Sequence, residues 1–274
     1  DHFLADIDGQ ALHFIHQRSP HADATPLIIT HGWPGSFVEF MGLVELLTEP
    51  EKHGGCAQDA FHVVCPSLPG YAWSQAAGAP GMNTREIARR QVALMAALGY
   101  DRYIAQGGDW GAMVTRHIAD LDPAHCMAIH LNMVIAFPPR DVDDPMSLAS
   151  DAEQQAMADD KVFMREGMGY FKIQSTRPQT LGYGLNDSPA GTAAWLTEKF
   201  RAWTDCDGEI RNALSWDTLL TNISVYWFSR SITSSTRLYY EDSHHPHLVE
   251  YLSTAEHALG KVFAFHNKHV SFRL

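Results

Sequence analysis

An acidic residue stands between glycines at residues 107–111, in the sequence Gly-Gly-Asp-Trp-Gly. Asp109 is two positions from a glycine on either side, and the segment follows a short apolar run and precedes a helix-like stretch. This spacing is typical of a nucleophile elbow, in which the chain turns from strand to helix so sharply that only very small neighbours fit. An acidic turn or helix cap has the same local pattern, so the segment alone leaves both interpretations open.

A second motif, His-Gly-Trp-Pro-Gly at residues 31–35, precedes the first by one strand-helix-strand-helix-strand unit. In folds with a nucleophile elbow, the loop at this position supplies a backbone N–H group to an oxyanion hole. By itself the motif predicts only a turn. Because the two motifs occur in this order and each follows a predicted strand, together they favour a catalytic site over two unrelated turns.

The chemical type of the nucleophile restricts the substrate. A carboxylate that attacks an ester carbonyl is expelled again, because it is the better leaving group. A carboxylate that attacks an sp3 carbon forms an ester, which water can open at the enzyme's own carbonyl. Asp109 therefore indicates an epoxide or an alkyl halide. Tyrosine hydroxyls nearby would favour the epoxide, because its oxygen leaves as an alkoxide that needs a hydrogen-bond donor.

The elements that must position the two motifs alternate between strand and helix. Strand-like apolar runs occupy residues 11–16, 26–30, the first part of 61–74, 102–106 and 126–132. Helical periodicity follows from Phe37, from Thr84, which we expect to be a helix cap, and from Trp110 to the stop at Pro123. This order predicts an α/β fold with a mostly parallel sheet covered by helices, in which ligands bind beyond the carboxyl ends of the strands. From residue 137 to about 240 the chain is rich in helix formers, which indicates an insertion.

The composition restricts partners and location. A formal charge of −12 disfavours nucleic acid and anionic membrane surfaces. The four cysteines form no CxxC pair, so we expect reduced thiols. No apolar stretch approaches the roughly 18 to 20 residues of a membrane span, and we expect a cytoplasmic protein. The chain begins at Asp1 without methionine, which leaves room for an upstream segment carrying an anchor.

The chain resembles the α/β-hydrolase-fold epoxide hydrolases, in particular the microsomal-type branch with its bacterial and juvenile-hormone-type relatives. The similarity covers residues 1 to about 242. It is carried by "HGWPGSFVEF", "CPSLPGYAWS", "QGGDWGAM", "HLNM", "GYFKIQSTRPQTLGYGLNDSPAGTAAWLTEKF" and "LLTNISVYWFSRSITSSTRLYYE". With this resemblance we expect an α/β-hydrolase core over residues 1–138, a helical cap over 139–242 and an atypical C-terminal segment over 243–274.

The resemblance also implies roles for individual residues. It makes Asp109 the nucleophile and assigns the oxyanion hole to the backbone N–H groups of Trp33 and Trp110. Tyr170 and Tyr239 match the two cap tyrosines that donate to the epoxide oxygen, with Tyr240 as a register alternative for Tyr239.

The substrate implied by the resemblance is a small apolar epoxide, which reacts with water to give a vicinal diol in the detoxification of xenobiotics. No metal or organic cofactor and no nucleic-acid partner are implied, and a homo-oligomer stays open. The histidine-rich residues 244–247 are interpreted as a loop and not as a metal site, because no second cluster of ligands pairs with them.

The family's general base is not recognisable in this chain. The resemblance calls for a histidine after Gly-Gly near the end of the chain and for an earlier carboxylate, but His266 and His269 follow no such glycines. Residues 248–259 have helical periodicity and 261–265 resemble a strand, yet no carboxylate follows that strand, and two strands of the sheet are missing. Either the chain is a fragment, with or without a shifted reading frame near residue 242, which we favour, or the protein lacks the pair that activates water.

This gap in the pattern limits the expected reaction. Without a base, we expect at most a single alkylation of Asp109, with slow or absent hydrolysis. Two other functions remain open: a haloalkane dehalogenase on the same scaffold, which would not need the tyrosine pair, and a non-catalytic binding protein.

Overall fold

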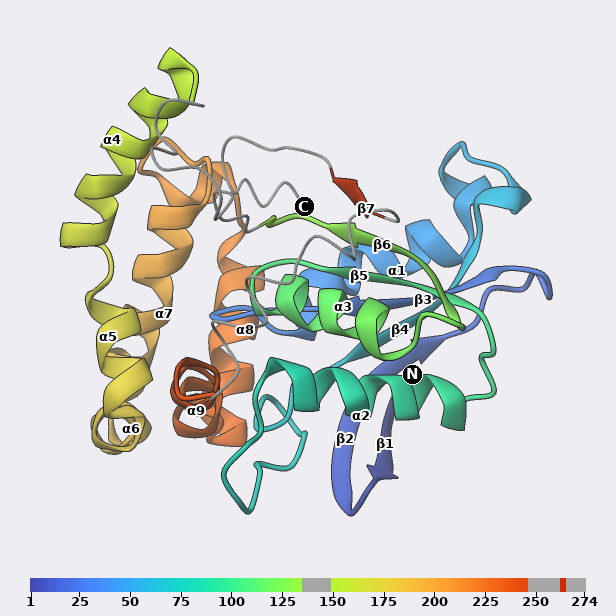
Figure 1. Ribbon diagram of the computed structural model, residues 1–274, viewed down its shortest axis with the longest axis horizontal. Helices are drawn as coiled ribbons and strands as arrows, with labels where there is room; N and C mark the ends of the chain where they lie inside the picture. Colours follow the sequence, from blue (N-terminus) through green and yellow to red (C-terminus); the bar gives the residue numbers. More distant parts are fainter. Residues whose placement is uncertain (135–148, 246–261, 265–274) are drawn as a thin grey trace.

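The computed structural model describes residues 1–134, 149–245 and 262–264, and in these residues seven strands form one sheet (Figure 1). The order of the strands across the sheet is β1-β2-β4-β3-β5-β6-β7. Their bounds are His2–Ile7 for β1, Gln10–Gln17 for β2, Thr25–Thr30 for β3, Phe61–Pro66 for β4, Tyr103–Gly107 for β5, Cys126–Leu131 for β6 and Val262–Ala264 for β7.

The pairing is parallel from β4 through β3, β5 and β6 to β7. The hairpin of β1 and β2 adds two strands at the other edge, with β2 antiparallel to β4. The predicted α/β fold with a mostly parallel sheet is therefore confirmed, as is a strand near residues 261–265. β1 is not identifiable from the sequence, because it is a largely exposed edge strand without the apolar run of a buried strand.

Helices cover both faces of the sheet. Successive side chains of a strand point to opposite faces, so Ile28 joins the apolar cluster under α2 (Thr84–Ala97) and α3 (Trp110–Leu121). Its neighbours Leu27 and Ile29 join the cluster under α1 (Met41–Thr48). The central strand is thus buried on both faces, which fixes the positions of the loops that follow it.

Two local predictions need correction. The helix expected from Phe37 is divided into a 3-10 turn, η1 (Phe37–Phe40), and α1. The cap of α2 is Asn83, whose side chain accepts a hydrogen bond from the N–H of Glu86 at 3.0 Å. Thr84 is the first helical residue, and its hydroxyl is not needed for capping, so it donates to Oδ1 of Asp242 at 2.6 Å.

Six helices follow the core in the described part of the chain, and Figure 1 shows them gathered beside one end of the sheet. They are α4 (Asp151–Glu166), α5 (Gly169–Thr176), α6 (Pro178–Asp187), α7 (Pro189–Trp203), α8 (Trp216–Ser229) and α9 (Ile232–Ser243). Short 3-10 turns are η2 (Pro50–His53), η3 (Ala57–Asp59) and η5 (Ile210–Asn212). Within the described residues, no helix combines the length and the apolar character that crossing a membrane requires.

Hydrogen bonds attach α8 to the loop after β3. The side-chain amide of Asn222 donates to the carbonyl oxygen of Pro34 at 2.8 Å, and its carbonyl oxygen accepts from the hydroxyl of Ser36 at 2.7 Å. The hydroxyl of Tyr226 donates to the carbonyl oxygen of Gly35 at 2.6 Å. All five residues are buried, so these bonds are shielded from water and hold the helical region against the core.

Candidate active site

Asp109 occupies the turn between β5 and α3. Its backbone has φ 52° and ψ −128°, a positive φ that is uncommon outside glycine. A Cβ atom on Gly107 would lie 2.0 Å from the carbonyl oxygen of Gly111, and one on Gly111 would lie 2.0 Å from that of Thr30. Only glycine fits at both positions. The turn therefore has the geometry of a nucleophile elbow, with the carboxylate at its apex.

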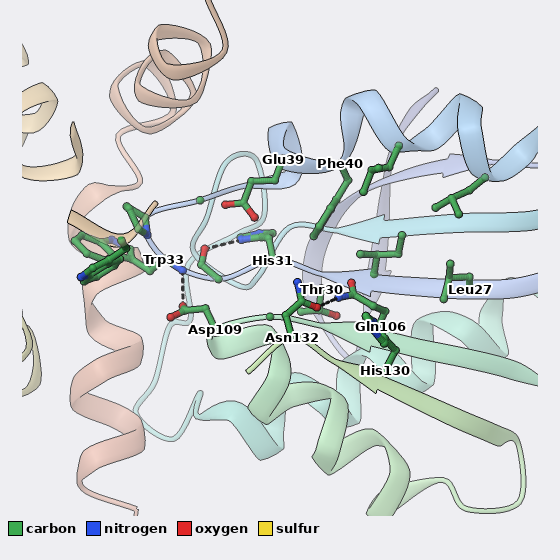
Figure 2. A pocket seen from close by; sticks show the side chains of 18 of the residues that line it. Leu27, Thr30, His31, Trp33, Glu39, Phe40, Gln106, Asp109, His130 and Asn132 are labelled. Atoms are coloured by element: carbon green, nitrogen blue, oxygen red, sulfur yellow. Dashed lines mark hydrogen bonds between the residues drawn. The ribbon is translucent and has the colours of Figure 1, made fainter. Parts of the chain in front are cut away.

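The loop at residues 31–35 lies against this carboxylate. The N–H of Trp33 donates to Oδ1 of Asp109 at 2.8 Å, as Figure 2 shows. The approach is so close that a Cβ atom on Gly32 would lie 2.2 Å from the same oxygen. The structure thus brings Asp109 together with the N–H of Trp33 and, at the start of α3, with that of Trp110, the two groups predicted for the oxyanion hole.

Burial changes the ionisation of Asp109. Removal from water raises its pKa to about 6, while the N–H groups of Trp33 and Trp110 act in the opposite direction by favouring the charged form. The carboxylate is therefore mainly ionised at pH 7, but it is a stronger base than an exposed aspartate. A buried, ionised carboxylate with few hydrogen bonds is suited to attack an electrophilic carbon.

A second carboxyl group, that of Glu39 in η1, points into the same cavity (Figure 2). It folds back over Gly35, where an added Cβ atom would overlap Oε1, and it has no hydrogen-bond or ion-pair partner among the described residues. Burial, together with the negative charge of Asp109, raises the pKa of Glu39 to about 8. Sequence reasoning missed Glu39, although an acidic residue inside the apolar run "FVEF" was a signal.

The two predicted cap tyrosines meet the core at the tryptophans. Tyr170 in α5 stacks on Trp33, with ring centroids 5.6 Å apart and an interplanar angle of 5°. Tyr239 in α9 meets the rings of Trp33 and Trp110 edge-on, at 5.8 and 4.8 Å. Burial first, and then the charge of Asp109, raises the pKa of both phenols, so both keep their protons and can donate them.

The two adjacent tyrosines of α9 differ in their surroundings. Tyr239 is 2% exposed, whereas Tyr240 is 38% exposed and stacks on His244 at 4.1 Å. Because neighbouring residues of a helix project about 100° apart, only one of them can face the core. In the described structure Tyr239 takes this position.

A cavity of about 450 Å³ opens beside Asp109 (Figure 2). Most of its lining is apolar and comes from β3, β4, β5, η1, α1 and the C-terminal part of α7. The polar or charged side chains in the lining are Thr30, His31, Glu39, Gln106, Asp109, His130, Asn132 and Lys199. Such a cavity, apolar with a few placed polar groups, suits a small apolar molecule. Lys199 was also missed, since nothing in the sequence of α7 marks it.

Two histidines, His31 and His130, line the cavity, and burial lowers the pKa of both. His31 is buried, with Nδ1 2.9 Å from the carbonyl oxygen of Gly32 and Nε2 accepting from the N–H of Leu68 at 3.2 Å. Burial lowers its pKa to about 4, so it is a structural residue of the loop. His266 and His269 lie outside the described residues, as does part of 244–247. No cluster of three or more potential metal ligands occurs in the part of the chain that the structure describes.

Two protein-family models match the chain. The model of the alpha/beta hydrolase fold matches residues 25–166, and the model described as epoxide hydrolase N terminus matches residues 1–40. The chain is 40% identical to Epoxide hydrolase 1 of Oryctolagus cuniculus over 264 residues, which cover 88% of this chain and 58% of that protein.

Solved structures agree with this similarity. Juvenile hormone epoxide hydrolase of the silkworm Bombyx mori matches with a TM-score of 0.80 and 33% identity, over 91% of this chain and 62% of that one. Epoxide hydrolase of Aspergillus niger matches with a TM-score of 0.77 and 33% identity, over 92% and 62%. The chain thus spans less than two thirds of the length of these relatives.

Proposed function

The chain belongs to the α/β-hydrolase family, on the branch of the epoxide hydrolases, and we propose that it opens apolar epoxides by attack of Asp109 on a ring carbon. One observation carries the proposal: the carboxylate of Asp109, fixed at a nucleophile elbow, is held by the N–H of Trp33, and the rings of Tyr170 and Tyr239 both contact the ring of that same tryptophan. An sp3 electrophile with a leaving oxygen needs this combination of a carboxylate and donors.

The first step forms a covalent ester. Oδ1 of Asp109 accepts a hydrogen bond from the N–H of Trp33. We propose that the other oxygen attacks the carbon from the side opposite the C–O bond. As that bond breaks, its electron pair goes to the epoxide oxygen, which we propose takes its proton from Tyr170 or Tyr239. Donors preorganised at a site of developing charge lower the barrier, because they need no rearrangement during the reaction.

The second step releases the diol. Water attacks the carbonyl carbon of the Asp109 ester, and the N–H groups of Trp33 and Trp110 would stabilise the oxyanion that forms there. The group that takes the proton from this water is not identified among the described residues. We therefore propose that this chain forms the ester, and that diol release by it is slow or absent.

The wider assignments belong to the same proposal. We propose a cytoplasmic enzyme that acts on epoxides of xenobiotics with water as co-substrate, without a nucleic-acid partner, and with its oligomeric state open. We also propose the division into a core of residues 1–138, a helical cap of 139–242 and an atypical segment of 243–274. The apolar cavity supports an apolar substrate, and the acidic charge disfavours a nucleic-acid partner.

Intact-protein mass spectrometry tests the proposal. After mixing with styrene oxide, the protein should gain the mass of one epoxide, and peptide mapping should place the adduct on Asp109. The matched variant Asp109→Asn should remain unmodified. If the unaltered chain gives neither an adduct nor the diol, the proposed reaction is wrong and a non-catalytic binding protein becomes the better hypothesis.

A haloalkane dehalogenase is the alternative with support from the structure. The buried indole Nε1–H of Trp33 has no hydrogen-bond partner among the residues that the structure describes, and it could donate to a leaving halide. Halide needs only weak donors, so replacing Tyr170 and Tyr239 together by phenylalanine would leave dehalogenation intact. A strong loss of alkylation by styrene oxide in the same double variant would support the epoxide assignment.

A further inference from the structure

Lys199, near the C-terminal end of α7, is a buried cation beside the candidate site. It is 5% exposed and lines the cavity that contains Asp109. Lysine is almost never this deeply buried in proteins, because its ammonium loses hydration. Its burial therefore needs a compensating partner.

The partner in the ion pair of Lys199 does not explain the burial. Nζ lies 2.6 Å from Oε1 of Glu198, but the side chain of Glu198 is 62% exposed. A pair with so exposed a carboxylate contributes little to stability, and it could form equally well at the surface. The contacts on the other side of the ammonium are therefore relevant to its position.

Aromatic rings surround the ammonium on its buried side. Nζ lies 4.6 Å from the ring centroid of Tyr170 and 5.8 Å from that of Trp203. The rings of Tyr170 and Trp203 are themselves 5.1 Å apart, and Tyr170 also stacks on Trp33. A cation within about 6 Å of a ring centroid is attracted by the ring's negative face. Tyr170 is thus held both by an indole of the core and by an ammonium of α7.

We propose that Lys199 is a positioning residue for Tyr170, which holds the phenol ring against Trp33 and assists its hydroxyl in proton donation to the epoxide oxygen. This inference rests on the proposed function. In ring opening the C–O electron pair moves to the epoxide oxygen, and the proton of the phenol passes to it. Negative charge develops on the epoxide oxygen and on the phenol oxygen of Tyr170. A nearby ammonium stabilises that charge without being consumed.

The groups around Tyr170 explain why a cation beside it would assist proton donation. Burial and the negative charge of Asp109 both raise the pKa of Tyr170, which makes loss of its proton harder. A hydrogen bond with Tyr239 acts in the opposite direction. Lys199 places a positive charge 4.6 Å from the ring centroid of the same phenol, and a positive charge favours the negative charge that the phenol gains when it donates its proton. A neutral side chain of the same length would still fill the space but would not supply the charge.

The test is single-turnover alkylation of Asp109 by styrene oxide, followed by rapid quenching and mass spectrometry over a range of epoxide concentrations. Lys199→Met should lower the saturating rate about 3- to 30-fold, while the half-saturating concentration changes less than about twofold. In the Tyr170→Phe background the same substitution should cause no further loss, because the phenol through which Lys199 acts is gone. Lys172→Met, an exposed lysine of α5, is the matched control and should react normally.

Other outcomes overturn the inference. If Lys199→Met slows the Tyr170→Phe protein by the same factor, Lys199 acts independently of this tyrosine and has only a structural role. If Lys199→Met slows neither the unaltered protein nor the Tyr170→Phe protein, the contact between Lys199 and Tyr170 has no catalytic consequence. Should methionine disturb the packing, as judged by circular dichroism, Lys199→Gln repeats the cycle with a polar neutral side chain. If the unaltered protein forms no adduct at Asp109, the proposed function fails together with this inference. If the unaltered protein forms the adduct and Lys199→Met forms it at the same rate, only the inference about Lys199 fails.

Discussion

The two halves of the candidate site are built in different ways. In the core, residues 31–35 and 107–111 are positioned by backbone atoms that approach so closely that a single Cβ atom does not fit. On the cap side, Tyr170 and Tyr239 are positioned by aromatic rings whose centroids lie about 5 to 6 Å from their neighbours. Backbone contacts cannot adjust, whereas packed rings can shift by small amounts. We therefore expect changes in the core half to act as all-or-none effects and changes in the cap half to give graded ones.

The largest effect should come from Gly111→Ala in the elbow. The added Cβ atom would lie 2.0 Å from the carbonyl oxygen of Thr30 and 2.9 Å from that of His31, so β3 and α3 would have to separate. We expect a loss of more than about 3 kcal/mol in the free energy of unfolding, measured by urea denaturation, or failure to fold. Gly184→Ala in α6 is the control: its Cβ meets nothing within 4 Å, and it should stabilise the protein by about 0.5 to 1 kcal/mol. Equal, small effects of the two substitutions would contradict the distinction between the two halves.

Asp109→Asn should abolish alkylation and, at the same time, stabilise the fold at neutral pH. The folded protein binds the proton of Asp109 more tightly than the unfolded chain does, since its pKa is raised from 3.8 to about 6. Stability contributed by Asp109 is therefore lost as the pH rises from about 4 to 7, and asparagine avoids that loss. The gain should reach at most about 3 kcal/mol, less any screening by solvent, and it should be larger at pH 8 than at pH 5. Urea denaturation at these two pH values measures it; a gain that does not depend on pH would exclude Asp109 ionisation as its source.

Single tyrosine substitutions should reduce the rate without abolishing the reaction. Tyr170→Phe and Tyr239→Phe each remove one donor to the leaving oxygen, and we expect alkylation to slow about 10- to 100-fold in each. Stopped-flow measurement of the change in tryptophan fluorescence during alkylation, calibrated by mass spectrometry, gives the rates. Tyr240→Phe, at the exposed neighbour, should react like the unaltered protein. If the Tyr240→Phe variant reacts slowly, the assignment of the donor to Tyr239 is wrong.

The smallest effect should be in the shape of the pH profile. Only ionised Asp109 is a nucleophile, so the alkylation rate should rise between pH 5 and 7 with a midpoint near 6. A second, several-fold rise near pH 8 should follow, when Glu39 ionises. Ionised Glu39 repels the negative charge of Asp109, and alkylation relieves this repulsion because it converts the carboxylate to a neutral ester. In Glu39→Gln the first rise should remain and the second should disappear. If the second rise persists in that variant, it belongs to another group.

Much of the core half could be predicted from the sequence. The strands β2 to β6 carry apolar runs or alternation, and the glycines of the elbow and of residues 31–35 mark turns that other residues cannot make. The errors there are local: the cap of α2 is Asn83 and not Thr84, and the exposed strand β1 carries little signal. In the cap half, Tyr170 and Tyr239 were named from a family resemblance, and Lys199 was not identified, because helical periodicity does not reveal which distant ring a side chain will meet.

The sequence by itself determined the kind of chemistry that the site can do. A carboxylate flanked by glycines at a strand-to-helix turn is a local property, since the steric limits of the turn depend on neighbouring residues. The tertiary structure decided the pKa of that carboxylate and which side chains lie near it. Burial raises the pKa of Asp109, and the fold of the chain places Tyr170, Tyr239 and Lys199 around the rings above it. These properties depend on contacts between segments far apart in the chain, and desolvation arises only when the packed core and cap exclude water together.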